Sequence, residues 1–274
     1  MKKEYGQLVR LPPFAGRLEP MYDHPELLQA LSDCERLLEG PATEILHGGR
    51  NRVGAVSLPR KDGRRVEVVI KEFCTRGVDR LKSLFFPGKA CRAWAGAHAL
   101  LERDIATPFP VAYLEERKNR FISRSYYLSE RIKDAEEVRS LFRSLNASEL
   151  PSLLRSLARH LRSCHLSGIL HRDLSDGNIL VRRDERGEYR FYLIDTNRVR
   201  VKRRISLLSR VKNLIRLGIP PQAQRFFLSQ YLEEDMGSTR IWFWYRLHKL
   251  SYSWYIELKK RLRVRQLARK LRIQ

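Results

Sequence analysis

Eight consecutive residues, 171–178, constrain this chain more than any other feature. They read His-Arg-Asp-Leu-Ser-Asp-Gly-Asn. Before them, apolar side chains recur at the three- and four-residue spacing of an amphipathic helix, which Gly168 is expected to end: Leu153, Leu157, Leu161 and Cys164. After them, two short apolar runs, 179–182 and 189–194, predict a hairpin. The sequence therefore predicts a polar loop between a helix and a hairpin, and an ordinary surface turn is the alternative interpretation.

The polar run resembles the catalytic loop of the protein-kinase fold, H-R-D-L-x-x-x-N, at every specified position. In that fold the Asp orients the attacking hydroxyl and accepts its proton, and the Asn holds a metal ion between the phosphates. Asp173 and Asn178 stand at these positions, and Arg172 is expected to support the loop. A second metal-binding carboxylate is expected after a buried strand, where this chain has Asp195. Only the Asp of the kinase D-F-G sequence is kept, and a strand-capping Asp is the alternative.

Two upstream features resemble the nucleotide-binding part of a kinase. The run 68–71, Val-Val-Ile-Lys, is similar to V-A-I-K, in which the lysine neutralises the α- and β-phosphates, so Lys71 is the candidate. The hairpin 47–54 is an imperfect G-x-G-x-x-G, in which Gly49 and Gly54 would let backbone amides approach phosphates. A solvated lysine and an ordinary hairpin turn are the alternatives. Arg52 and its neighbour Arg50 could add positive charge there.

One expected part of a kinase site is missing. A helix predicted over 89–103 has no acidic residue in its middle to pair with Lys71. Either Glu102 reaches back from the last turns or His98 takes the usual place of the acid, and the sequence leaves both open.

The order of the predicted elements indicates an α+β fold of two lobes, similar to a protein kinase. Residues 1–40 are expected to form an N-terminal extension with one helix over 26–39. Residues 41–131 are expected to form a β-rich lobe that has a three-stranded meander over 42–73, the helix 89–103, and strands over 111–115 and 121–130. Residues 132–274 are expected to form an α-rich lobe with basic, aromatic-rich C-terminal helices.

The motifs together resemble those of the bacterial lipopolysaccharide kinase family. The resemblance rests on the run 171–178, on Ile-Asp-x-x-Arg over 194–198, and on the run 105–111, and it spans roughly residues 43–200. It implies transfer of phosphate to heptose or 3-deoxy-D-manno-octulosonic acid (Kdo) in the lipopolysaccharide inner core. It also implies ATP and Mg²⁺ as cofactors, with Lys71 on the nucleotide phosphates, Asp173 as the base, and Asn178 and Asp195 on the metal.

Charge points to an anionic partner. The chain has 54 Lys and Arg against 31 Asp and Glu, a net charge of +23. From residue 196 onward there are 20 basic and 4 acidic residues, and no A-P-E sequence of a protein-substrate kinase is present. Aromatic residues at 242–245 and 252–255 are expected mainly in the core. A stripe of Leu258, Leu262, Leu267 and Leu271 on a basic helix would suit an anionic membrane surface.

The cysteines and the hydropathy of the chain indicate where it is located. Four scattered cysteines, no apolar export segment and no membrane-spanning run favour the cytoplasm. The resemblance to the lipopolysaccharide kinase family implies a lipid-linked sugar as acceptor and a place at the inner face of the inner membrane. A kinase of the same fold that acts on protein, an RNA-associated kinase, and a catalytically silent pseudokinase scaffold remain alternatives. The sequence does not indicate an oligomeric state.

Overall fold

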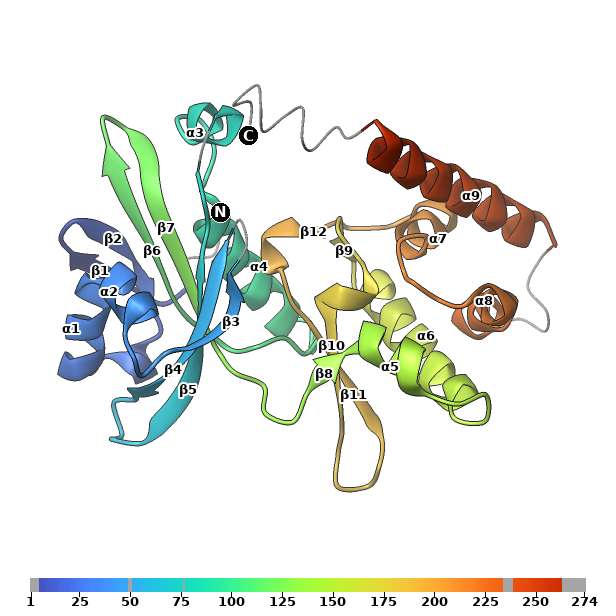
Figure 1. Ribbon diagram of the computed structural model, residues 1–274, viewed down its shortest axis with the longest axis horizontal. Coiled ribbons are helices and arrows are strands. Elements are labelled where there is room, and N and C mark those ends of the chain that lie inside the picture. Colours follow the sequence, from blue (N-terminus) through green and yellow to red (C-terminus); the bar gives the residue numbers. More distant parts are fainter. Residues whose placement is uncertain (1–4, 49–50, 76, 234–238, 263–274) are drawn as a thin grey trace. The chain divides into compact units, whose positions relative to one another are not determined.

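The computed structural model describes residues 5–48, 51–75, 77–233 and 239–262 (Figure 1). The chain divides into two compact units. Of these described residues, those between 5 and 99 and between 108 and 133 belong to the first unit, and those between 100 and 107 and between 134 and 262 belong to the second. Both units combine strands and helices, so the predicted α+β class is confirmed.

The first unit is built on an antiparallel sheet. Within the described residues it has seven strands in the order β1-β2-β6-β7-β5-β4-β3. Their bounds are β1 Gln7–Leu11, β2 Phe14–Leu18, β3 Glu44–Gly48, β4 Arg52–Pro59, β5 Arg65–Glu72, β6 Pro110–Lys118 and β7 Phe121–Glu130. The predicted meander is confirmed as β3-β4-β5, and the two later strands as β6 and β7.

The residues before Gly40 contain more than the one predicted helix. They begin with the hairpin β1-β2, whose second strand pairs with β6. The single helix expected over 26–39 is wrong, because α1 (Pro25–Ser32) and α2 (Cys34–Glu39) are separate. Asp33 divides them: its backbone is not helical, and its side chain accepts a hydrogen bond from the Arg36 N–H at 3.0 Å. An N-cap side chain of this kind begins a new helix.

Two further helices complete the first unit. The short helix α3 (Val78–Lys82) was not predicted, and α4 (Lys89–Leu101) confirms the helix expected over 89–103. The small side chains of α4 let it lie close to the sheet, where Ala93, Trp94 and Ala97 pack with Phe73 and Tyr127.

The second unit is mainly helical and has one core. Its helices are α5 (Val138–Ser144), α6 (Leu150–Leu166), α7 (Leu207–Leu214), α8 (Gln224–Leu232) and α9 (Thr239–Arg261). Its strands are β8 (Glu136–Glu137), β9 (Ile169–His171), β10 (Ile179–Arg183), β11 (Tyr189–Leu193) and β12 (Val199–Val201). The leucine stripe of α6 is buried, as its period predicts, and the helix packs against α8, β9 and β11. Gly168 follows α6 at φ 77°, a conformation that favours glycine.

Acid is expected to destabilise the second unit through His165 of α6. Burial lowers the pKa of His165 from 6.5 to about 4. Its ring nitrogens contact the Tyr231 hydroxyl at 2.7 Å and the Asn213 Oδ1 at 3.0 Å. The unfolded chain protonates His165 below pH 6.5, and the folded chain protonates it only near pH 4. The contribution of the neutral His165 side chain to the free energy of unfolding is therefore fully present above pH 6.5. It is lost as the pH falls to about 4, by up to about 3 kcal/mol.

Denaturant titrations between pH 7 and 4 would measure this loss. His165→Gln is expected to be less stable at pH 7 but to show a shallower decline towards pH 4, because the titrating group is gone. An unchanged slope in the variant would assign the acid sensitivity to other groups, such as His160, whose pKa burial also lowers to about 4.

Candidate active site

A buried histidine joins the two segments that carry the predicted acidic residues. His171, at the end of β9, is 2% exposed. Its Nε2 lies 3.0 Å from the Ile194 carbonyl oxygen, and its Nδ1 accepts a hydrogen bond from the Asp173 N–H at 3.3 Å. These contacts require a neutral ring with the proton on Nε2, and burial accordingly lowers its pKa. His171 therefore fixes the backbone on both sides of the site.

Asn178 and Asp195 lie at the same end of one hairpin. The strands β10 and β11 pair Ile179 with Leu193, and the Ile194 N–H donates to the Asn178 carbonyl at 3.0 Å. Asp195 follows directly with φ 60° and ψ 41°, the left-handed conformation. Asp and Asn adopt this conformation more readily than most residues. The hairpin thus brings the two predicted metal ligands together within the second unit.

The donor set at this end of the hairpin fits Mg²⁺. The Asn178 Nδ2 donates to the Asp173 carbonyl at 2.7 Å, so the amide nitrogen is used within the loop and the amide oxygen is the atom of this side chain that could coordinate a metal. Mg²⁺ takes oxygen ligands and is held in such sites by one or two protein groups together with substrate phosphates. The described residues contain no cluster of three or more His, Cys, Asp or Glu that could hold a metal alone. The residues therefore fit a metal that arrives with a nucleotide.

The side chain of Asp173 is held by an arginine that the sequence analysis missed. Arg216, in the loop after α7, lies with Nη1 2.6 Å from the Asp173 Oδ1. The same nitrogen donates to the Arg172 carbonyl at 3.1 Å. Arg172 itself is tied to the site through its backbone, because its N–H donates to the Arg198 carbonyl at 3.1 Å.

The helix α9 holds Arg216 in place. The Arg216 Nε donates to the Tyr252 hydroxyl at 3.3 Å, and the guanidinium lies 5.6 Å from the centroid of that ring. Lys249, one turn earlier, donates to the carbonyls of Ile215 and Leu217 on both sides of Arg216, at 3.1 and 2.6 Å. Burial lowers the pKa of Lys249 to about 8. A chain of contacts therefore connects α9 to the candidate base.

Replacing Arg216 with glutamine is expected to lower kcat about 10- to 100-fold, because the Asp173 carboxylate loses the group that orients it. The KM for the nucleotide is expected to stay within a factor of about two, and Arg216→Lys should recover part of kcat. Steady-state kinetics of the proposed transfer would measure both. Arg190→Gln is the matched control, because Arg190 is an exposed residue of β11 that pairs with Asp184 at 3.0 Å. An equal fall in both variants would contradict a role for Arg216 in positioning.

The predicted nucleotide-binding residues belong to the first unit. Lys71 lies in β5 opposite Val53 and Tyr127, and its Nζ lies 5.3 Å from the Phe73 ring centroid. Gly54 lies inside β4, where an added Cβ would meet the Thr43 Cγ2 at 2.6 Å. Close packing therefore explains this glycine without a phosphate. Gly49 and Arg50 lie outside the described residues.

The two candidates for the missing helix acid have other neighbours in the structure. His98 stacks on Tyr5 with ring centroids 4.2 Å apart and lies 3.3 Å from a Glu19 oxygen. Glu102 follows the end of α4 and lies 3.8 Å from Arg103. These contacts do not identify a partner for Lys71, so both candidates stay predictions.

Arg52 serves a different purpose from the one predicted. It pairs with Glu39 and Glu72 at 2.6 Å each and with Glu35 at 3.6 Å, which raises its pKa. Its charge is therefore balanced by carboxylates that join α2 to β4 and β5, which leaves it a structural role within the first unit.

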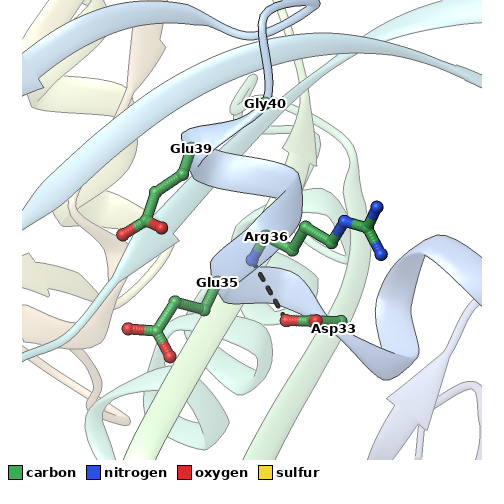
Figure 2. Close-up of a pocket in the computed structure, with 5 residues that line it drawn as sticks. All are labelled: Asp33, Glu35, Arg36, Glu39 and Gly40. Atoms are coloured by element: carbon green, nitrogen blue, oxygen red, sulfur yellow. Dashed lines mark hydrogen bonds between the residues drawn. The ribbon is translucent and has the colours of Figure 1, made fainter.

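An open hollow beside α2 is lined in part by the glutamates that pair with Arg52. Its volume is about 500 Å³, and Figure 2 shows the carboxylates of Glu35 and Glu39 on one side of the helix and Arg36 on the other. Arg52 pairs with both glutamates, and Arg124 also pairs with Glu35 at 2.7 Å. The hollow is thus the edge of an ion-pair network and shares no residue with the candidate active site.

Comparison with known proteins agrees with this geometry. The profile described as "Lipopolysaccharide kinase (Kdo/WaaP) family" matches residues 69–231, more than half of the chain. A solved structure titled "WaaP in complex with acyl carrier protein" is similar with a TM-score of 0.58 and 17% identity, over 84% of this chain and 97% of that chain. No curated protein matches the chain. The structural similarity confirms the predicted protein-kinase-like fold.

Proposed function

The chain belongs to the lipopolysaccharide kinase (Kdo/WaaP) family, and from this premise we propose that it transfers the γ-phosphoryl group of ATP to a sugar hydroxyl of the lipopolysaccharide inner core. The acceptor sugar would be Kdo or heptose. One observation carries the proposal: the hydrogen bonds that His171 and Asn178 make with the Asp173 backbone, and that His171 makes with the Ile194 carbonyl before Asp195, lie inside the region that the family profile matches.

The proposed transfer is an in-line displacement in which the protein mainly positions the reactants. The acceptor oxygen forms a bond to the γ-phosphorus while the bond to the ADP oxygen breaks. The acceptor proton passes to the Asp173 carboxylate, which Arg216 orients through Oδ1. Because His171 is neutral and has both ring nitrogens in hydrogen bonds, its role is to position the loop.

The proposal assigns Asn178 and Asp195 to Mg²⁺ and Lys71 to the nucleotide phosphates. Mg²⁺ would neutralise the charge that develops on the phosphate oxygens. Gly49 and Gly54 keep their proposed role near the phosphates, although Gly54 also has a packing reason to be glycine.

The proposed acceptor is lipid-linked, which would bring the protein to the cytoplasmic face of the inner membrane. No described helix is long and apolar enough to cross a bilayer. The excess of basic residues supports contact with an anionic surface. Nucleic acid is a less favoured partner, because no RNA-binding motif accompanies the charge.

An acceptor assay tests the proposal. Purified protein would receive ATP and Mg²⁺ with lipid-linked Kdo, lipid-linked heptose, a generic protein substrate or RNA. We expect phosphate to appear on one of the two sugars only. Transfer to protein or RNA alone would contradict the acceptor, and nucleotide binding without any transfer would support the pseudokinase scaffold.

A further inference from the structure

The helix α9 has two apolar faces, and the described residues cover only one of them. The covered face contains Tyr245, which is fully buried, and Lys249 and Tyr252, which contact the loop that carries Arg216. The opposite face exposes large apolar side chains; we call it the outer stripe, and it consists of Phe243, Leu247, Leu250, Trp254 and Leu258. Phe243 and Trp254 are each 71% exposed.

The outer stripe is continuous along the helix. Its members recur at spacings of four, three, four and four residues, which places them about 180° around the helix axis from Tyr245. From residue 243 to residue 258 the stripe is about 22 Å long. In Figure 1, α9 lies at the edge of the second unit, beside α7. A folded protein rarely leaves such a length of apolar helix uncovered, so the stripe indicates a surface that binds a partner.

The charges around the outer stripe indicate the chemistry of that partner. Arg240, Arg246, Lys259 and Arg261 belong to the same helix. Glu257 is the one acidic residue in its sequence, and it lies 3.5 Å from Arg261. Two copies of this helix packed together would bring like charges close to one another, which opposes association. An anionic surface would neutralise the same charges.

We propose that the outer stripe of α9 lies on the surface of an anionic lipid bilayer. The apolar side chains would enter the boundary between headgroups and acyl chains, and the cations of the helix would contact lipid phosphates. This proposal deepens the proposed function, because it places the contact with the membrane that carries the acceptor. It also assigns opposite faces of one helix to the bilayer and to the loop that orients Asp173.

A second exposed apolar cluster supplies a control for substitutions in the outer stripe. Leu84, Phe85 and Phe86 follow α3 in the first unit and are also exposed. They lie in an irregular segment, whereas the outer stripe has regular helical spacing and is supported from behind by a buried face. Substitution of Phe85 and Phe86 by glutamine is therefore the matched control, because it removes a similar exposed apolar area elsewhere.

The experiment is co-sedimentation of the full chain with vesicles, without ATP or acceptor. We expect binding to vesicles that contain phosphatidylglycerol, and at least about 100-fold weaker binding to pure phosphatidylcholine vesicles. The triple variant Leu247→Gln, Leu250→Gln, Trp254→Gln is expected to bind anionic vesicles at least about tenfold more weakly, because it loses the inserted apolar area. Glutamine keeps a high helix propensity, and circular dichroism would confirm that the variant folds.

Three results would overturn the proposal. The first is binding of the triple variant to anionic vesicles as tight as that of the unchanged protein. The second is loss of binding in the Phe85 and Phe86 variant in place of the triple variant. The third is no binding of the unchanged protein to anionic vesicles. Light scattering distinguishes a second copy of the chain, since a dimer that the triple variant abolishes would assign the stripe to self-association and so also overturn it. Because the assay contains no nucleotide or sugar, its failure is separate from failure of the kinase assignment.

Discussion

Asp173→Asn is expected to lower kcat about 1000-fold while the protein stays folded. Asparagine has nearly the same shape as aspartate but cannot accept the acceptor proton, and such proton transfer contributes about 10²- to 10⁴-fold. The contacts that Asp173 makes with His171 and Asn178 use its backbone, so the loop should keep its conformation. Phosphate transfer to the sugar acceptor, followed under saturating ATP, would measure the loss.

Asp184→Asn provides the control for Asp173, because Asp184 lies in the exposed turn of the same hairpin that carries Asn178. Its activity should stay within a factor of about two of the unchanged protein. Retention of more than a tenth of kcat by Asp173→Asn would show that another group accepts the proton.

Asp195→Asn is expected to reduce turnover at least about 1000-fold by a different route, the loss of a charged metal ligand. Asparagine tolerates the left-handed backbone at this position, whereas alanine would be strained there by about 1 kcal/mol. Asn is therefore the cleaner substitution. Titration of Mg²⁺ against ATP binding in a calorimeter should show a loss of metal affinity of at least about tenfold.

The comparison of Asp195→Asn with Asp195→Ala separates the two roles of this position. Both variants should lose metal affinity, but only Asp195→Ala should also lower Tm, because only alanine strains the backbone. An unchanged Mg²⁺ titration in Asp195→Asn would remove Asp195 from the metal site.

Much of the fold could be predicted because its elements carry strong periodic patterns. The strands β4 to β7 are eight to ten residues long and rich in apolar residues, and the helix α6 carries a regular leucine stripe that ends before Gly168. The hairpin β1-β2 was missed because its strands are short and a Pro-Pro pair separates them. The break between α1 and α2 was missed because the N-cap role of Asp33 depends on the backbone bending there, which a hydrophobic pattern does not reveal.

The candidate site was predictable where spacing along the chain matters and unpredictable where folding brings distant residues together. Asp173 and Asn178 are five residues apart, so one motif contains both. Arg216 is 43 residues from Asp173 and is one of 54 basic residues in the chain, so no local signal singles it out. Its place after α7 and its contact with Tyr252 become visible only in the structure.

The prediction that the aromatic residues of the C-terminal region lie in the core is correct for some of them and wrong for others. Trp242, Trp244, Tyr245 and Tyr252 belong to the core or pack against it, as expected. Phe243, Trp254 and Tyr255 are exposed, so the core prediction is wrong for them. Their exposure follows from their position on the far side of a helix that buries only one face. Leu267 and Leu271 of the predicted stripe lie outside the described residues.

The order of strands in the first unit has a consequence for how the chain can be shortened. The family profile begins at residue 69, inside β5, yet β1 to β4 all precede that residue. A fragment cut to the profile would expose the backbone edges of β5 and β6 that β4 and β2 cover, and unpaired strand edges favour aggregation. It would also lack α9. The segment that the family profile matches is thus smaller than the segment expected to fold. Protein fragments made for expression should therefore start before β1.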